Sequence, residues 1–252
     1  MTAPLLLVEG LTRRFGGLIA ASDVSFAVAP GEIFGIIGPN GAGKTTLFNV
    51  IAGHYRPTSG RVAFEGTDIS GHASDEVGRR GIARTFQAVH VFKNETVRAN
   101  LHRAAILARR HNPLAWLSRH PHATPDLEGT AAFLGLDKLL DNVAGSLAYG
   151  LQKTVGVGLA MMVGPKLMLM DEPAAGLNPS EKIAAAALIR RLRDERGISV
   201  LLVEHDMPLV MGICDRILVL NQGIPIALGT PAEVKSNQAV IDAYLGEDYE
   251  FA

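Results

Sequence analysis

A glycine-rich segment at residues 38–46 restricts the fold of this chain more than any other feature. It reads Gly-Pro-Asn-Gly-Ala-Gly-Lys-Thr-Thr and directly follows an apolar, β-rich run at residues 33–37. The spacing matches G-x-x-x-x-G-K-[ST], in which glycines let successive backbone N–H groups point inward at phosphate oxygens. The sequence therefore predicts a strand, a phosphate-binding loop and a helix in that order, as in an α/β nucleotide-binding core.

The side chains of this loop have separate expected roles. We expect Lys44 to reach the terminal phosphates and the hydroxyl of Thr45 to bind Mg²⁺, while the start of the helix adds partial positive charge. The alternative is a glycine-rich turn beside a surface lysine, which needs neither the strand nor the helix that flank the motif. The nucleotide-binding residues predicted from the motif are Gly38, Asn40, Gly41, Ala42, Gly43, Lys44, Thr45 and Thr46.

A second part of the site is predicted where the hydrophobic run at residues 167–170 ends in two carboxylates, Asp171 and Glu172. We expect Asp171 to hold magnesium through its water shell and Glu172 to orient and polarise the attacking water. The two acids could instead cap the next element. A buried strand in a chain of net charge −1 seldom ends in this way without a cation, however, and this favours the metal site.

Further apolar runs predict the fold class, an α/β P-loop NTPase (RecA-like) core. Continuous runs at residues 200–203 and 217–220 are expected to be parallel strands covered by helices on both faces. Alternating runs at residues 24–28 and 61–65 predict an antiparallel β subdomain beside that sheet.

The expected helices define one nucleotide-binding domain over residues 1–252 with an inserted α-helical subdomain. Residues 96–150 lack β-rich runs and hold helix-like stretches around 101–110 and 130–140. A later helix at 181–196 has a capping Asn178 before it and a closing Gly197 after it. We expect the core at about 1–95 and 155–230, the helical subdomain at about 96–154, and a C-terminal helix and tail at about 231–252.

Composition restricts the partners and the compartment. The 24 basic and 25 acidic side chains produce no overall field that would attract nucleic acid. The single cysteine, Cys214, cannot form an internal disulfide, so we expect a buried apolar side chain in a reducing compartment such as the cytoplasm. No apolar stretch reaches the ~20 residues that span a bilayer, so a partner would have to supply any membrane contact.

The order of these motifs resembles the ATP-binding-cassette family over nearly the whole chain. The resemblance implies that Gln87, in Arg84-Thr85-Phe86-Gln87, meets Mg²⁺ and water and senses a transmembrane partner. It also implies that His205 is the switch histidine at the γ-phosphate, where the alternative is an ordinary structural histidine. Phe15 resembles the aromatic residue on which adenine stacks, with core packing as its alternative. The implied ligands are ATP and Mg²⁺.

The family signature L-S-G-G-Q is altered here to Leu-Ala-Tyr-Gly-Leu at residues 147–151. In the family this loop binds the γ-phosphate of the ATP on a partner cassette in a head-to-tail dimer. Ala148 has no hydroxyl to donate, whereas Gly150 and the helix N-terminus remain. A loop that merely joins two helices is the alternative. Asn178 stands where the family usually has an aspartate, and it is a dimer contact, a helix cap or both.

Several segments are similar to one ATPase subunit of bacterial branched-chain amino-acid importers, among them Leu-Ala-Tyr-Gly and Glu-His-Asp-Met. The similarity implies transmembrane permease subunits, a second and unlike ATPase, an indirectly linked periplasmic solute-binding protein, and a cytoplasmic location on the inner face of the cell membrane. Alternatives are an importer of another solute, a lipopolysaccharide-export ATPase with a Leu-Gly-Glu-Asp ending, and a soluble non-transport cassette. An arginine- and histidine-rich strip at 96–125 is either a docking surface or a solvated helix face.

Overall fold

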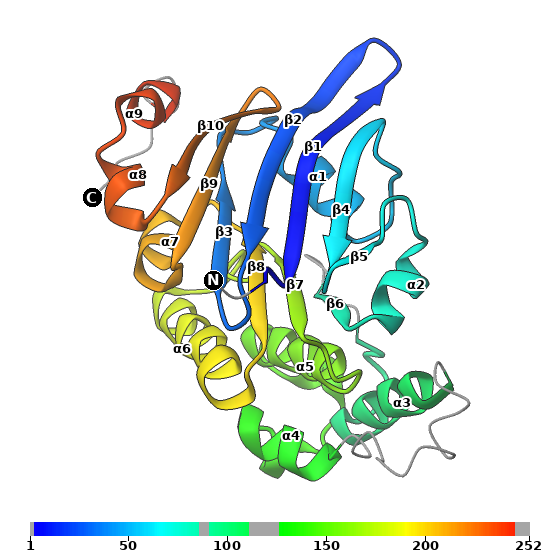
Figure 1. Ribbon diagram of the computed structural model, residues 1–252. Coiled ribbons are helices and arrows are strands. Elements are labelled where there is room, and N and C mark those ends of the chain that lie inside the picture. The colour runs from blue at the N-terminus through cyan, green and yellow to red at the C-terminus, as the bar shows by residue number, and fades with distance from the viewer. Residues whose placement is uncertain (1–2, 86–90, 111–125, 245–252) are drawn as a thin grey trace.

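A computed structural model describes residues 3–85, 91–110 and 126–244 of the chain, and the side chains of 108–110 are not considered. Helices and strands are interspersed along it (Figure 1). The strands are β1 (Leu6–Phe15), β2 (Leu18–Val28), β3 (Ile33–Ile37), β4 (Ser59–Phe64), β5 (Thr67–Asp68), β6 (Ile82–Thr85), β7 (Leu167–Asp171), β8 (Ser199–Val203), β9 (Arg216–Asn221) and β10 (Ile224–Gly229). The helices are α1 (Lys44–Ile51), α2 (Ser74–Arg79), α3 (Val97–Arg110), α4 (Leu127–Leu134), α5 (Tyr149–Met161), α6 (Pro179–Arg196), α7 (Met207–Ile213), α8 (Pro231–Lys235) and α9 (Gln238–Tyr244), with short 3₁₀ turns η1 (Asp137–Leu139) and η2 (Ala144–Ser146).

The centre of the molecule is a six-stranded sheet in the order β10-β9-β3-β8-β7-β6. β9, β3, β8, β7 and β6 are parallel to one another, and β10 pairs antiparallel with β9. Every residue of β3, β7 and β8 is buried, as expected for strands covered on both faces. The α/β class and the parallel core predicted from the continuous apolar runs are confirmed.

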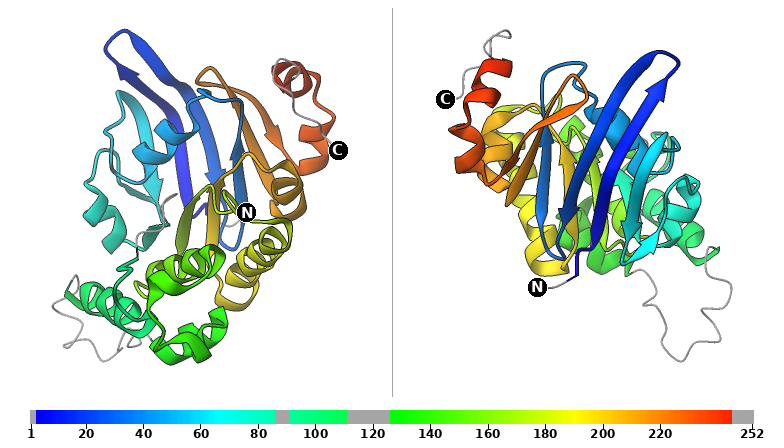
Figure 2. Two further views of the ribbon diagram at one scale, coloured as in Figure 1. Left: turned by 180° about the vertical axis from the view of Figure 1, so that it is seen from behind. Right: turned by 45° about the horizontal axis from the view of Figure 1, so that its top comes forward.

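A second sheet, in the order β2-β1-β4-β5, is antiparallel and confirms the predicted β subdomain. It lies on one face of the six-stranded sheet, and α1 lies between the two sheets (Figure 2). The rings of Phe26 on β2 and Phe34 on β3 stack with their centroids 5.0 Å apart and join the sheets directly. Leu47 and Phe48 of α1 are fully buried in the same core.

The helices α5, α6 and α7 cover the opposite face of the six-stranded sheet, and α3 and α4 pack against α5, so that all five contribute to a second hydrophobic core (Figure 2). Strand alternation divides the two cores: Met168 and Met170 of β7 point to this helical side, and Leu167 and Leu169 point to the side of α1. In the part of the chain that the structure describes, no helix combines the length and the apolar character needed to cross a membrane.

The inserted region is helical, but one expected helix ends early. The helix predicted at 130–140 stops at Leu134, because Gly135 takes a left-handed conformation with φ 69° and closes α4. Leu136 then turns fully into the core before η1. The predicted boundary of the helical subdomain at residue 154 falls within α5, which continues to Met161. The division into subdomains stays a prediction.

The predicted capping of α6 is confirmed. The side chain of Asn178 accepts a hydrogen bond from the amide of Glu181, and the Glu181 side chain accepts one from the Asn178 amide, 2.9 Å away. Pro179 occupies the first turn, and Gly197 ends the helix with φ 65°. Asn178 therefore serves as a helix cap, and its contact with a partner stays a prediction.

Candidate functional site

The predicted site residues gather where neighbouring parallel strands end at one edge of the central sheet. The glycine loop follows β3, His205 follows β8, and Asp171 and Glu172 end β7. The strand register places Val203 at the end of β8 opposite both Ile36 of β3 and Asp171 of β7. Carboxyl ends of parallel strands meet at one edge, so the loop, the histidine and the acid pair form one site. Gln87 comes two residues after β6 and lies outside the described residues.

Two glycines of the loop are required by its geometry. Gly38 has φ 151°, and a Cβ there would collide with the carbonyl oxygen of Leu220. Gly43 has φ 92°, and a Cβ there would collide with the carbonyl oxygen of Ala20. Both collisions involve backbone, which cannot give way as a flexible side chain can. The loop therefore runs so close to β9 and β2 that only glycine fits at these two positions.

The loop surrounds the uncapped N-terminus of α1. Gly43 precedes this helix and offers no side-chain cap, and the first turn holds no acidic residue. By contrast, side chains cap α6, α7 and α8. The ammonium of Lys44 donates hydrogen bonds to the carbonyls of Gly38 at 2.6 Å and Pro39 at 2.9 Å, so its charge lies across the loop. Exposed Thr45 and partial positive charge at the helix start suit a phosphate ligand.

The remaining loop residues differ in exposure. Asn40 and Gly41 are exposed, whereas the side chain of Ala42 is only 2% exposed and packs in the core beneath the loop. Ala42 also donates its amide to the carbonyl of Pro39 at 3.1 Å. The structure thus places the predicted nucleotide residues together, with Ala42 facing the protein interior rather than the surface.

Asp171 is held by an arginine for which the sequence motifs predict no role. The guanidinium of Arg84 on β6 donates to the Asp171 carboxylate at 2.9 Å and to the side-chain oxygen of Asn49 on α1 at 2.6 Å. The Arg84 and Asp171 side chains are only 14% and 6% exposed. Asp171 shares the strand face of Leu167 and Leu169, which points at α1. One charge-compensated contact therefore fixes β6, β7 and α1 to one another.

Glu172 has an unusual backbone conformation. Its φ of 48° places it in the left-handed region, which costs a residue other than glycine about 1–3 kcal/mol unless its surroundings hold it there. Its amide donates to the carbonyl of Val203 at 2.8 Å. Its own carbonyl accepts a hydrogen bond at 3.0 Å from the ammonium of Lys153 on α5. The carboxylate lies 3.9 Å from Nδ1 of His205, so the two predicted catalytic side chains are neighbours.

A buried glutamate joins the two loops that carry these side chains. Glu204 is 1% exposed, and its carboxylate accepts hydrogen bonds from the amides of Ala174 at 2.7 Å, His205 at 2.8 Å and Asp206 at 3.1 Å. These bonds connect the segment after β7 with the segment after β8. The side chain of His205 is 49% exposed, 3.9 Å from both Glu172 and Glu204, and open to a ligand. The exposure favours the switch interpretation over a buried structural histidine.

The altered signature loop forms the start of α5. Ala148 is the N-cap residue of this helix, and its methyl group cannot accept a capping hydrogen bond. The first turn contains no acidic residue. Gly150 packs so closely on α6 that a Cβ there would lie 2.8 Å from Oε1 of Glu181. The helix start thus resembles that of α1, because its first N–H groups have no side-chain partner in the described chain.

Phe15 ends β1 beside two further side chains that sequence reasoning did not identify. Its ring is 39% exposed and meets Tyr55 edge-on, with the centroids 5.2 Å apart. The guanidinium of Arg13 lies 4.4 Å from the Phe15 ring. Phe15 belongs to neither hydrophobic core, so its position disfavours the core-packing alternative and leaves an aromatic surface for a ligand.

Two other predictions concern residues outside this site. Cys214 is buried, and burial raises the pKa of its thiol, in agreement with the predicted apolar role. In the described part of the basic strip, Arg98 pairs with Glu128 and Asp141, and Arg103 pairs with Glu95. Such neutralised arginines favour the solvated-helix alternative over a docking surface.

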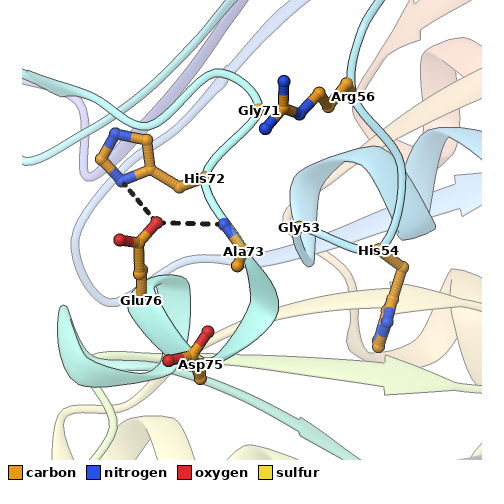
Figure 3. Close-up of a pocket in the computed structure, with 8 residues that line it drawn as sticks. All are labelled: Gly53, His54, Arg56, Gly71, His72, Ala73, Asp75 and Glu76. Carbon is orange, nitrogen blue, oxygen red and sulfur yellow. Dashed lines mark hydrogen bonds and ion pairs between the residues drawn. The ribbon is translucent and has the colours of Figure 1, made fainter.

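A polar cavity of about 350 Å³, which the sequence did not predict, lies at the C-terminal end of α1, the end away from the glycine loop. It opens between the end of α1 and the start of α2 (Figure 3). His72 and Glu76 lie 3.8 Å apart on one wall, and His54 lies on the other. Burial and the charge of Arg84 lower the pKa of His54. The lining residues are Gly53, His54, Arg56, Gly71, His72, Ala73, Asp75 and Glu76.

Known families and proteins match the chain over most of its length. Residues 21–175 match the ABC transporter family, and residues 225–250 match the family of the branched-chain amino acid ATP-binding cassette transporter. The high-affinity branched-chain amino acid transport ATP-binding protein BraF of Pseudomonas aeruginosa is 44% identical over 257 residues, covering 98% of this chain and 100% of that protein. Its counterpart LivG of Escherichia coli K12 is 42% identical over 254 residues, with the same coverage.

Solved structures of ATP-binding cassettes also match the fold over nearly the whole chain. The ADP conformation of an ATP-binding cassette of an ABC transporter superposes with a TM-score of 0.84 at 33% identity, covering 98% of this chain and 100% of that one. A nucleotide-free ATP-binding cassette from an ABC transporter gives a TM-score of 0.82 at 32% identity over 97% of this chain and 100% of that one.

Proposed function

Because the chain belongs to the ABC transporter family, we propose that it is the ATP-hydrolysing subunit of an importer for branched-chain amino acids. The convergence of the glycine loop, the acid pair and His205 at one edge of the parallel sheet supports ATP hydrolysis at this position. The solute is supported by the match at residues 225–250 and by the relatives BraF and LivG, whose names state branched-chain amino acid transport.

The loop residues bind the triphosphate. The backbone N–H groups of the loop and of the first turn of α1 point at phosphate oxygens, and Lys44 exchanges the carbonyls of Gly38 and Pro39 for the β- and γ-phosphates. The exposed ring of Phe15 stacks on adenine. Mg²⁺ bound with ATP neutralises phosphate charge, and the candidate residues for holding it are Thr45, Asp171 and Gln87.

The acid pair and His205 carry out the chemistry. Glu172 orients a water molecule and polarises it for attack on the γ-phosphorus. His205, 3.9 Å from Glu172, contacts the γ-phosphate. Arg84 keeps Asp171 directed toward α1, whose first turn holds Thr45, the other candidate for binding Mg²⁺. Gln87, two residues after β6 in the sequence, is the further residue proposed to meet Mg²⁺ and water.

A second cassette completes the site. The N-terminus of α5, with Ala148 and Gly150, faces the γ-phosphate on the partner in a head-to-tail dimer, and its uncapped N–H groups supply the contact that a serine hydroxyl would otherwise provide. The partner is a second, unlike ATPase. Permease subunits supply the membrane path, a periplasmic protein delivers the solute to them, and this chain works at the inner face of the membrane.

Glu172→Gln tests the proposed chemistry. The variant is expected to bind Mg-ATP like the natural protein but to lose nearly all turnover, because the amide cannot polarise water as the carboxylate does. Calorimetric ATP binding and phosphate release measure the two steps. Glu195→Gln, which changes an exposed acid at the far end of α6, is the matched control and retains full turnover. Normal hydrolysis by Glu172→Gln would contradict the role of Glu172.

Transport by the whole assembly tests the solute. The chain is expected to co-purify with polytopic membrane subunits, and the reconstituted assembly to take up leucine, isoleucine or valine when ATP is supplied. Uptake of a different solute, or export of lipopolysaccharide, would retain the ATPase but contradict the proposed cargo. Co-purification with ribosomes or DNA alone would contradict a role in transport.

A further inference from the structure

The first turn of α5 packs closely on two neighbouring parts of the chain, the segment that follows β7 and the first turn of α6. A Cβ at Gly176 would lie 3.1 Å from Cε1 of Tyr149, so the tyrosine ring rests on the backbone of this segment. A Cβ at Gly150 would lie 2.8 Å from the carboxylate of Glu181. At both places a glycine gives a neighbouring side chain room to approach the backbone. The start of α5 therefore packs too closely on these two parts of the chain to move past them.

A lysine adds a polar connection between α5 and the segment that follows β7. The ammonium of Lys153, one turn into α5, donates to the carbonyls of Glu172 and Pro173, both at 3.0 Å. It also lies 5.6 Å from the centre of the Tyr149 ring. Burial lowers the pKa of Lys153, although the carboxylates of Glu204 and Glu172 oppose this shift. An ordinary surface lysine would instead extend into water.

One of these hydrogen bonds is accepted by Glu172, the residue of the acid pair whose backbone is in the left-handed region. Glu172 has φ 48°, and its carbonyl accepts from Lys153 and, at 3.1 Å, from the amide of Ala175. A left-handed residue that is not glycine persists only where its surroundings hold it. The direction of the Glu172 side chain follows from this backbone conformation, so a group that holds the carbonyl also directs the carboxylate.

We propose that Lys153 is a positioning residue for Glu172, through which a displacement of residues 147–150 at the start of α5 is transmitted to the backbone of Glu172. The inference rests on the proposed function, in which Glu172 polarises water. In the head-to-tail dimer, residues 147–150 face the nucleotide of the partner, while Glu172 serves the nucleotide bound to this chain. Lys153 thereby connects the two composite sites within one subunit.

Lys153→Met tests the connection, because methionine keeps much of the length of the side chain but cannot donate a hydrogen bond. In the full-length chain within its transporter, kcat is expected to fall about 10- to 100-fold, the effect of misplacing a catalytic group. The KM for Mg-ATP should change less than about twofold, since the binding loop is untouched. Lys153→Arg, which keeps the donor, is expected to retain most of kcat.

A second measurement separates positioning from general stability. Hydrogen exchange of the amides at residues 173–176 is expected to be faster in Lys153→Met, whereas exchange in β8 and the melting temperature stay as in the natural protein. The matched control is Lys166→Met. Lys166 precedes β7 at its opposite end and pairs with exposed Glu65 at 2.6 Å, so this variant should change neither kcat nor exchange at 173–176.

Each outcome decides one point. Unchanged kcat and unchanged exchange in Lys153→Met would overturn the proposal, and so would faster exchange throughout the protein with a lower melting temperature. Glu172→Gln reports on the proposed function separately. If that variant is inactive while Lys153→Met behaves like the natural protein, the role of Lys153 alone is wrong. If Glu172→Gln hydrolyses ATP normally, the proposed function itself is wrong.

Discussion

The guanidinium of Arg84 lies 2.9 Å from the carboxylate of Asp171, and the two side chains come from adjacent strands at positions 87 residues apart in the sequence. Asn49 of α1 binds the same guanidinium, so three elements meet at one buried charge pair. The Asp171 carboxylate therefore has a fixed direction and a compensated charge within the protein itself. Removing the Arg84 side chain should therefore lower the free energy of unfolding by a measurable amount.

Arg84→Met is expected to lower the free energy of unfolding by about 3–5 kcal/mol, because it leaves the buried carboxylate of Asp171 without its partner. Urea denaturation measures the change. The control is Arg79→Met, which removes the exposed pair with Asp75 on α2 and should cost at most about 1 kcal/mol. Equal losses in the two variants would mean that the Arg84 pair is no more than a surface contact.

Gly43→Ala is expected to abolish ATP binding and to destabilise the fold, because the new Cβ collides with the carbonyl of Ala20. Gly66→Ala is the control. Its φ of 75° imposes the same backbone strain, but nothing lies within 4 Å of the added carbon, so it should cost about 1–2 kcal/mol and leave ATP affinity intact. Thermal melting and calorimetry with Mg-ATP distinguish the two. Normal ATP affinity in Gly43→Ala would show that the loop can shift.

Phe15→Ala is expected to weaken ATP binding by about 1–3 kcal/mol, the value of a base–aromatic stack, without lowering kcat. Phe15→Trp should restore the affinity. Phe92 is a matched control because it is also exposed, at 53%, and has Arg103 5.0 Å from its ring centre, yet belongs to the helical region. If Phe92→Ala weakened ATP binding as much as Phe15→Ala, adenine stacking on Phe15 would be excluded as the cause.

Asp206→Asn is expected to change the pH dependence of stability. Burial raises the pKa of Asp206, but hydrogen bonds from Lys182, 2.6 Å away, and from the amide of Leu209 outweigh it and hold the pKa below its ordinary value. A lowered folded pKa stabilises the protein above the unfolded pKa of about 3.9, and this contribution is lost as the pH falls through the folded pKa.

The free energy of unfolding of the natural protein should therefore exceed that of Asp206→Asn by about 0.5–1 kcal/mol at neutral pH. This is the value of an exposed ion pair, which is appropriate because Lys182 is half-exposed. The difference should shrink below a pH of about 4. Asparagine keeps an oxygen for capping α7, so the comparison isolates the charge. Urea denaturation at a series of pH values measures it, and a constant difference from neutral to acidic pH would contradict the assignment.

Local patterns in the sequence predict the frame of the site because each depends on a few adjacent residues. The strands that carry the glycine loop and the acid pair are buried on both faces and appear as unbroken apolar runs. Asn178 and Glu181 form the capping box that their spacing predicts. The helix expected at 130–140 shows the limit of such patterns, because a single glycine at 135 ends it in the left-handed conformation.

The contacts that orient the site have no such local pattern. Arg84 and Asp171, Lys153 and Glu172, and Glu204 and Ala174 are 87, 19 and 30 residues apart. Each pair meets only after the parallel sheet has brought distant strand ends and α5 together. Polar residues at strand ends indicate that a site exists, but tertiary packing decides which of them touch. The role of Gln87 stays a prediction, because it lies outside the described residues.

The position of α1 between the two sheets joins the ligand to the stability of the whole fold. The glycine loop leads into the N-terminus of this helix. Its buried side chains, Leu47, Phe48, Val50 and Ile51, fill the core that connects the sheets. A ligand that binds only the folded chain adds RT ln(1 + [L]/Kd), about 2.7 kcal/mol at 100 times Kd. A cell rich in ATP thus protects this subunit from unfolding and proteolysis, and energy starvation would shorten its lifetime as well as stop its work.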